Sequence, residues 1–298
     1  MSLRDPSDRT LGFLLLAPAF LLLALIVAYP IGKLLWNSFF DLRLSGGDAA
    51  ARFVGWDNYA LVLTDPAFWN ATRNTVLITL ITVPGALLLG LGLALLANLP
   101  FKRQWPVRLA LLLPWALPLS FVGLIFAWFF HTEYGVVNDL LRRVGGSSPA
   151  QAPTMWLLRP PLAFAAICGA IIWKTSSFMA LILLAGLQMI PKSLYEAAEV
   201  DGASRWQQFC QITLPMLMPS IIVALIFRTI TALQTFDIPY TMTKGGPGDA
   251  TETLAMLIHK TTIDYLDVGY GSTLAVFMFV LSLGVTAVYL RRIGRNAG

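Results

Sequence analysis

The chain has 298 residues, of which 57% are hydrophobic and only 12% are charged, and its mean hydropathy is +0.70. Soluble domains carry about 25% charged residues, so this composition indicates an integral membrane protein. The net charge of +5 would indicate nucleic acid as a partner of a soluble chain, but basic cytoplasmic loops explain it in a membrane protein. Two cysteines and two histidines make no disulfide framework or metal cluster, and the sequence contains no GxxxxGK[ST] phosphate loop.

Six apolar runs predict six membrane-spanning helices. The first, at 11–36, follows Arg4 and Arg9 and exceeds the core of about 7–15 residues that is typical of a cleaved signal peptide. The third contains Pro114 and Pro118, which membrane helices tolerate and which often kink them. The other five spans are expected at 75–96, 109–130, 162–187, 214–236 and 273–290.

The connecting segments set the expected topology. The polar segment 131–159 is interpreted as an exposed loop, and a short helix is expected near 253–263. Arg and Lys are densest in the segments that share a side with both termini, so that side is expected to be cytoplasmic. The expected divisions are a cytoplasmic N-terminus (1–10), a first transmembrane helix (11–36), a five-helix core (72–290) and a cytoplasmic tail (291–298).

The segment 190–212 is a polar stretch between the apolar fourth and fifth spans, on the predicted cytoplasmic side. Ser193 with Glu196 three residues later matches a capping box, so a short helix is expected to begin at Leu194. Gly202 is expected to end that helix in the left-handed conformation. Ser204 followed by Gln207 repeats the capping pattern and predicts a second short helix.

The sequence of segment 190–212 resembles that of a known protein family. Glu196-Ala197-Ala198, then Gly202, then Ile212 and Leu214-Pro215 resemble the coupling loop of permease subunits in binding-protein-dependent ABC importers. The resemblance implies an all-α, six-helix membrane fold of the type I importer, with a cytoplasmic coupling helix between spans four and five. In that family the loop docks into a separate ATPase subunit. The residues that this implies for ATPase coupling are Glu196, Ala197, Ala198, Asp201, Gly202 and Ala203.

The same resemblance implies the partners and the location of the chain. The partners are a second homologous permease subunit, two ATPase subunits that bind ATP and Mg²⁺, and an extracytoplasmic sugar-binding protein. The location is the cytoplasmic membrane of a bacterium or archaeon, in contact with lipid and without nucleic acid. No cofactor, catalytic residue or metal ligand is expected in this chain.

Two cations lie inside predicted spans. Lys174 is about 18 Å below the outer end of the fourth span, and Arg228 is about 21 Å above the inner end of the fifth. In a hydrocarbon core of about 30 Å, both fall in the middle third. An ionisable group at that depth is costly and indicates a functional site. Arg228, Thr231 and Thr235 follow at helical spacing, although polar residues of this kind also join helices in membranes.

From Lys174 to Gly246-Pro247 the chain resembles maltose-type permease subunits, in which the corresponding stretches line the translocation cavity. The resemblance implies substrate contacts at Lys174, Thr175, Phe178, Arg228, Thr231, Ala232 and Thr235. The two cations replace uncharged residues of that pattern. The first hypothesis is a trehalose- or maltose-like disaccharide, followed by other neutral sugars and by an anionic polyol such as glycerol phosphate or a sugar phosphate. An ion-coupled secondary carrier would need a mid-depth carboxylate, and an intramembrane enzyme would need an acid–base pair or a metal cluster.

Overall fold

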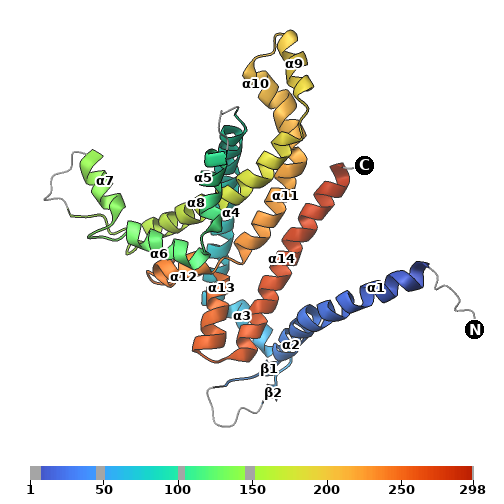
Figure 1. Cartoon of the computed structure of the whole chain (residues 1–298). Helices are drawn as coiled ribbons and strands as arrows, with labels where there is room; N and C mark the ends of the chain where they lie inside the picture. The colour runs from blue at the N-terminus through green and yellow to red at the C-terminus, as the bar shows by residue number, and fades with distance from the viewer. Residues whose placement is uncertain (1–7, 45–50, 100–104, 145–151, 297–298) are drawn as a thin grey trace, which may run out of the picture. The chain divides into compact units, whose positions relative to one another are not determined.

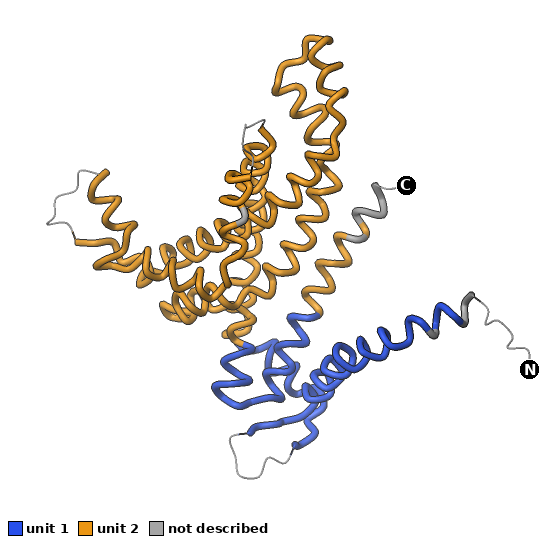
Figure 2. Tube along the Cα trace, viewed as in Figure 1, with its two compact units in different colours: residues 1–65, 258–279 blue, residues 66–257, 280–298 orange. Residues whose placement is uncertain are grey.

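The computed structural model describes residues 8–44, 51–99, 105–144 and 152–296, which form the helices drawn in Figure 1. The chain divides into two compact units, coloured separately in Figure 2. The smaller unit consists of residues 1–65 and 258–279, and the larger of residues 66–257 and 280–298.

The smaller unit begins with one long helical stretch that contains a π-helical turn. Its elements are α1 (Asp8–Leu23), η1 (Ala24–Ala28), α2 (Tyr29–Asn37), β1 (Phe40–Asp41), β2 (Arg52–Phe53), α3 (Asp57–Thr64), η3 (Lys260–Asp264) and the start of α14 (Val268–Asn296). The two short strands pair antiparallel, with Phe40 opposite Phe53. Two side-chain hydrogen bonds tie the unit together, from Tyr270 Oη to Asp65 Oδ2 at 2.6 Å and between Ser38 Oγ and Tyr59 Oη at 2.7 Å.

The larger unit holds the core. Its elements are α4 (Pro66–Asn98), α5 (Trp105–Ala116), α6 (Leu119–Phe129), α7 (Val136–Val144), α8 (Pro160–Gln188), α9 (Lys192–Val200), α10 (Arg205–Gln208), η2 (Phe209–Thr213), α11 (Leu214–Leu233), α12 (Asp237–Thr243), the first four residues of α13 (Leu254–His259) and the end of α14. α8 packs closely against α4, because small residues line the contact. A Cβ on Gly90 would lie 2.6 Å from Met179 Cβ and 2.9 Å from the carbonyl oxygen of Ser176.

Within the described residues, five helices are long and apolar enough to cross a membrane. They are Leu15–Asn37, Pro66–Asn98, Pro160–Gln188, Arg205–Leu233 and Val268–Tyr289. The third predicted span is instead a pair of shorter apolar helices, α5 and α6. The break falls at Pro118, which has no N–H to donate and takes an extended conformation (φ −59°, ψ 141°) ahead of α6.

Two connecting segments contain helices. The interpretation of 131–159 as a loop was wrong in part, because α7 lies within it. Val136, Leu140 and Val144 recur every four residues there, an amphipathic spacing that the polar composition of the segment concealed. The short helix expected near 253–263 is confirmed as α13 followed by the π-helical turn η3.

Candidate functional site

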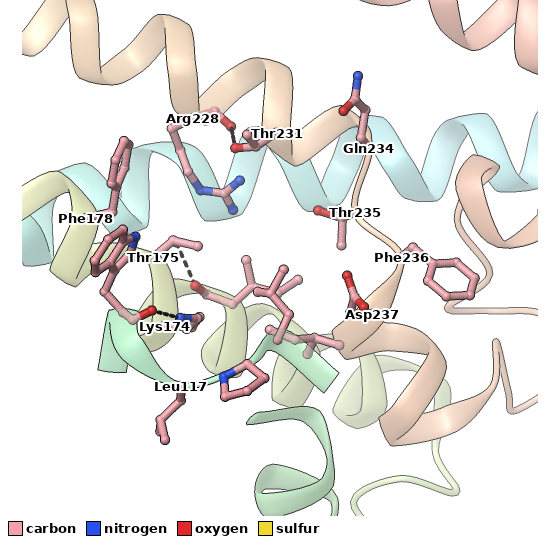
Figure 3. A pocket seen from close by; sticks show the side chains of 15 residues that line it. Leu117, Lys174, Thr175, Phe178, Arg228, Thr231, Gln234, Thr235, Phe236 and Asp237 are labelled. Carbon is pink, nitrogen blue, oxygen red and sulfur yellow. Dashed lines mark hydrogen bonds between the residues drawn. The ribbon is translucent and has the colours of Figure 1, made fainter. Parts of the chain in front are cut away.

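A cavity of about 520 Å³ lies in the larger unit, among the α5–α6 break, α8, α11 and the start of α12 (Figure 3). That volume is within the range of about 300–1,000 Å³ typical of small-molecule sites. Six residues that the sequence predicts as substrate contacts line it: Lys174, Thr175, Phe178, Arg228, Thr231 and Thr235. Their contact with substrate stays a prediction. Ala232 is fully buried and is not part of the lining.

Lys174 is 5% exposed and is held by a backbone group. Its Nζ donates a hydrogen bond of 2.5 Å to the carbonyl oxygen of Trp115. Trp115 lies in the last turn of α5, where carbonyls lack the helical partner that a continuing helix would supply. A cation at a helix C-terminus is also favoured by the helix dipole. The break before Pro118 therefore creates the acceptor that accommodates this buried ammonium.

Arg228 is 3% exposed and only partly satisfied. Its Nη2 donates to Thr82 Oγ1 on α4 at 3.0 Å, whereas its Nε is buried without a hydrogen-bond partner. The guanidinium points toward the cavity in Figure 3. Among the described residues, neither Arg228 nor Lys174 has a carboxylate within ion-pair distance. The cavity therefore holds two cations that no carboxylate in this part of the chain neutralises directly.

Two threonines in the lining donate their hydroxyl protons to their own helices. Thr175 Oγ1 donates to the carbonyl of Ile171 at 2.7 Å, and Thr231 Oγ1 donates to the carbonyl of Arg228 at 3.0 Å. Each hydroxyl oxygen then offers lone pairs as an acceptor. Phe178 adds an aromatic side chain to the same wall. The combination suits a ligand with hydroxyl groups and an apolar ring face.

Asp237 also lines the cavity, and sequence reasoning missed it. It is the first residue of α12, and its Oδ1 accepts a hydrogen bond from Ser120 Oγ of α6 at 3.0 Å.

The fifth span was predicted to continue to Phe236, but α11 ends at Leu233. Residues 234–236 then turn the chain, so Thr235 and Asp237 reach the cavity from beyond the helix. The predicted helical stripe through Thr235 was therefore wrong, although Thr235 does line the cavity.

The segment 190–212 forms two short helices and a turn. α9 begins at Lys192 with Pro191 as its N-cap, so the predicted capping box at Ser193 and Glu196 was wrong. Ser193 lies inside the first turn because Pro191 already supplies the extended residue ahead of the helix (φ −62°, ψ 132°). Gly202 has φ +76°, which confirms the left-handed turn.

The second predicted capping box is confirmed. Ser204 Oγ accepts from the Gln207 N–H at 3.4 Å, and the Ser204 N–H donates to Gln207 Oε1 at 2.8 Å. Residues 190–212 together form the elbow. Tyr195 anchors it through a 2.9 Å hydrogen bond between its hydroxyl and Thr213 Oγ1.

The elbow presents a largely exposed surface. Of the six residues predicted to couple to an ATPase, Glu196, Ala197, Asp201 and Gly202 are exposed, and Ala198 and Ala203 are half-buried. A Cβ on Gly202 would meet nothing within 4 Å. Val200 and Trp206 are 89% and 72% exposed, so apolar side chains stand in the open on the same elbow. Small residues beside exposed apolar ones suit a surface that another protein covers.

Apolar helices of membrane-spanning length, a cavity with buried cations among them and an exposed helical elbow define a membrane permease component. The chain belongs to the family of binding-protein-dependent transport system inner membrane components, whose model matches residues 86–294. Members of this family are permeases and not catalytic subunits.

Two relatives are similar over nearly the whole chain. The sulfoquinovosyl glycerol transport system permease protein SmoG of Agrobacterium fabrum is 66% identical over 287 residues, covering 96% of this chain and 91% of that protein. The trehalose/maltose transport system permease protein MalF of Thermococcus litoralis is 40% identical over 289 residues, covering 97% and 95%.

The fold is also similar to solved structures. A chain of a bacterial ABC transporter involved in the import of the acidic polysaccharide alginate matches with a TM-score of 0.82 at 22% identity. The match covers 98% of both chains. This likeness identifies the type I ABC importer permease fold.

Proposed function

We propose that this chain is the permease subunit of an ATP-driven importer whose substrate is a glycoside carrying a sulfonate group. The observation that carries the proposal is the pair of buried cations, Lys174 and Arg228, in the cavity lining. A relative that is 66% identical is named for sulfoquinovosyl glycerol, a sugar derivative with one sulfonate. The residues proposed to contact the substrate are Thr175, Phe178, Arg228, Thr231 and Thr235, and Lys174 contributes its charge to the same cavity.

Burial of a cation carries an electrostatic cost. A guanidinium removed from water is stabilised only by acceptors or by an opposite charge. Arg228 has one hydroxyl acceptor, from Thr82, and none at Nε. A sulfonate brings a negative charge and three acceptor oxygens, and charge-assisted hydrogen bonds are about twice as strong as neutral ones. A sulfonated ligand therefore supplies Arg228 with acceptors and a negative charge that the described residues do not provide.

A second candidate is a neutral trehalose- or maltose-like disaccharide. The 40% identical relative that is named for trehalose and maltose supports it. Phe178 and the acceptor hydroxyls of Thr175 and Thr231 suit a neutral sugar equally well. The cations distinguish the two candidates, because a neutral sugar brings no negative charge to them.

We also propose that the elbow transmits ATP-driven motion. In this mechanism two ATPase subunits bind ATP and Mg²⁺ and clasp the elbow, with Glu196 as a charged anchor and Gly202 as the point of close approach. A second homologous permease supplies the other half of the pathway, and an extracytoplasmic binding protein delivers the substrate. Both termini and the elbow lie on the cytoplasmic side, and 72–290 forms the moving core.

Uptake into proteoliposomes tests the proposal. The full complex is reconstituted with its cognate binding protein and ATP, and labelled sulfoquinovosyl glycerol, trehalose and maltose are compared. We expect ATP-dependent, vanadate-sensitive uptake of the sulfonated glycoside and background uptake of the two disaccharides. Disaccharide uptake without uptake of the sulfonated glycoside would overturn the assignment in favour of the neutral candidate.

A further inference from the structure

We infer that the cavity binds its substrate in one orientation, with the sulfonate at Arg228 and the uncharged, hydroxyl-bearing end at Asp237. The inference rests on the proposed function and adds the direction in which the substrate lies. Figure 3 shows the two side chains reaching the cavity from different elements, Arg228 from α11 and Asp237 from the start of α12. Because Arg228 is positively charged and Asp237 is negatively charged, the two ends of the cavity lining favour different chemical groups.

Arg228 has the chemistry of an anion site. A guanidinium carries five N–H donors in a rigid fork, and here Nη2 is used by Thr82 while Nε has no partner. A buried guanidinium whose donors are only partly used is unfavourable, and a ligand that supplies acceptors relieves part of that cost. Because Arg228 is 3% exposed and lines the cavity, a bound oxyanion can accept from the terminal N–H groups that Thr82 leaves unused and also neutralise the charge.

Lys174 has a different role, although it is the second cation. Its ammonium is engaged by the Trp115 carbonyl at the end of α5, so it holds the edge of the α5–α6 break in place. An ammonium that leaves this carbonyl for a ligand exchanges one acceptor for another and orphans the carbonyl. We therefore assign Lys174 as a positioning residue and Arg228 as the sulfonate ligand.

Asp237 has the chemistry of a hydroxyl site. An ionised carboxylate only accepts hydrogen bonds and offers about four lone-pair sites, of which Ser120 occupies one on Oδ1. The remaining sites can accept from hydroxyl groups of a ligand, and Thr235, two residues earlier in the chain, also lines the cavity. A negative group placed here would be repelled. Asp237 thus binds the polyol end and excludes a sulfonate, so a reversed substrate is disfavoured.

A ligand-by-variant comparison tests this orientation in the assembled complex of both permeases and both ATPases, without the binding protein. The ligands are sulfoquinovosyl glycerol, the same glycoside with a 6-hydroxyl in place of the sulfonate, and methyl sulfoquinovoside, which lacks the glycerol. Isothermal titration calorimetry gives each Kd. Arg228→Gln should weaken both sulfonated ligands about 10- to 100-fold and leave the neutral glycoside nearly unchanged. Asp237→Asn should weaken the two glycerol-bearing ligands about 3- to 10-fold and spare methyl sulfoquinovoside.

Lys174→Gln is the matched control, because it removes a cation from the same cavity. It should reduce the preference for the sulfonate much less than Arg228→Gln does, because the Arg228 guanidinium remains. The inference is overturned if Arg228→Gln weakens sulfonated and neutral ligands equally, or if Lys174→Gln alone removes the preference for the sulfonate. Arg228→Lys keeps the charge but lacks the forked guanidinium, so it should retain part of the preference for the sulfonate. This variant replaces Arg228→Gln if the Arg228→Gln complex does not assemble. Equal weakening of all three ligands by Arg228→Lys also overturns the inference.

The proposed function and the proposed orientation can be refuted separately. If the wild-type complex does not bind sulfoquinovosyl glycerol, the proposed function and the orientation both fall. If the wild type binds it but Arg228→Gln and Asp237→Asn show no ligand-dependent difference, only the orientation falls.

Discussion

Lys174 of α8 donates a hydrogen bond to the carbonyl oxygen of Trp115, the penultimate residue of α5. The contact joins a buried ammonium to the end of a helix, and each group satisfies a need of the other. The ammonium gains an acceptor inside an apolar helix bundle, and the terminal carbonyl gains a donor. Because both residues line the cavity, the contact shapes one of its walls.

Removal of this ammonium should destabilise the larger unit. Lys174→Met leaves the Trp115 carbonyl without its donor, at a cost of about 1–3 kcal/mol. We expect a lower midpoint of thermal unfolding of the detergent-solubilised complex. Arg142→Met is the control, since Arg142 lies on α7 of the same unit and is exposed. Equal midpoints for Lys174→Met and the wild type would show that the contact contributes nothing to stability.

Repair of the helix break should make Lys174 dispensable to the fold. Pro118→Ala restores an N–H and lets α5 continue into α6, so that the Leu119 N–H competes for the Trp115 carbonyl. We expect Pro118→Ala to lower uptake, because the break shapes the cavity. Lys174→Met should then cost less stability in the Pro118→Ala background than in the wild type, as residues sharing one partner are non-additive. Additive losses in the double variant would contradict the shared acceptor.

A side chain at the turn of the elbow should uncouple ATP hydrolysis from transport. Gly202 has φ +76° and open space around it, so Gly202→Asp adds backbone strain of about 1–2 kcal/mol and a side chain on the proposed ATPase-facing surface. We expect loss of substrate-stimulated ATPase activity and of uptake.

Gly248→Asp is the matched control for the elbow, because Gly248 also has positive φ (+58°) and nothing within 4 Å of its Cβ position. It lies outside the elbow and should keep coupling. If the two variants behave alike in ATPase and uptake assays, backbone strain explains the effect and the docking role of Gly202 is wrong.

Close packing of α4 on α8 should fail when Gly90 gains a methyl group. The Cβ of Gly90→Ala would lie 2.6 Å from Met179 Cβ and 2.9 Å from a backbone oxygen, so the helices must separate. Overpacking of this kind costs about 1–3 kcal/mol. Gly92→Ala, two residues further along the same helix, meets nothing within 4 Å and should be neutral. Thermal unfolding of the two variants compares them directly, and equal midpoints would rule out the packing argument.

Local patterns predicted much of the site. The two cations were found because a charged residue in an apolar run is conspicuous, and six of the seven predicted substrate contacts line one cavity. The turn at Gly202 and the capping box at Ser204 were read from single residues with strong local preferences. Asp237 was missed because the end of α11 at Leu233 depends on packing, and an apolar run that continues to Phe236 does not reveal it.

The sequence by itself determined the membrane class and five of the six predicted spans, because a bilayer sets the length and apolarity of any helix that crosses it. It also predicted that the two cations lie at mid-depth. Only the tertiary structure decided what satisfies those cations. Lys174 finds its acceptor 59 residues away and Arg228 finds its acceptor 146 residues away. Contacts at such separations arise from how helices pack against one another, which no local spacing of residues encodes. The packing of the helices likewise decides that Nε of Arg228 has no hydrogen-bond partner and that Asp237 lines the cavity.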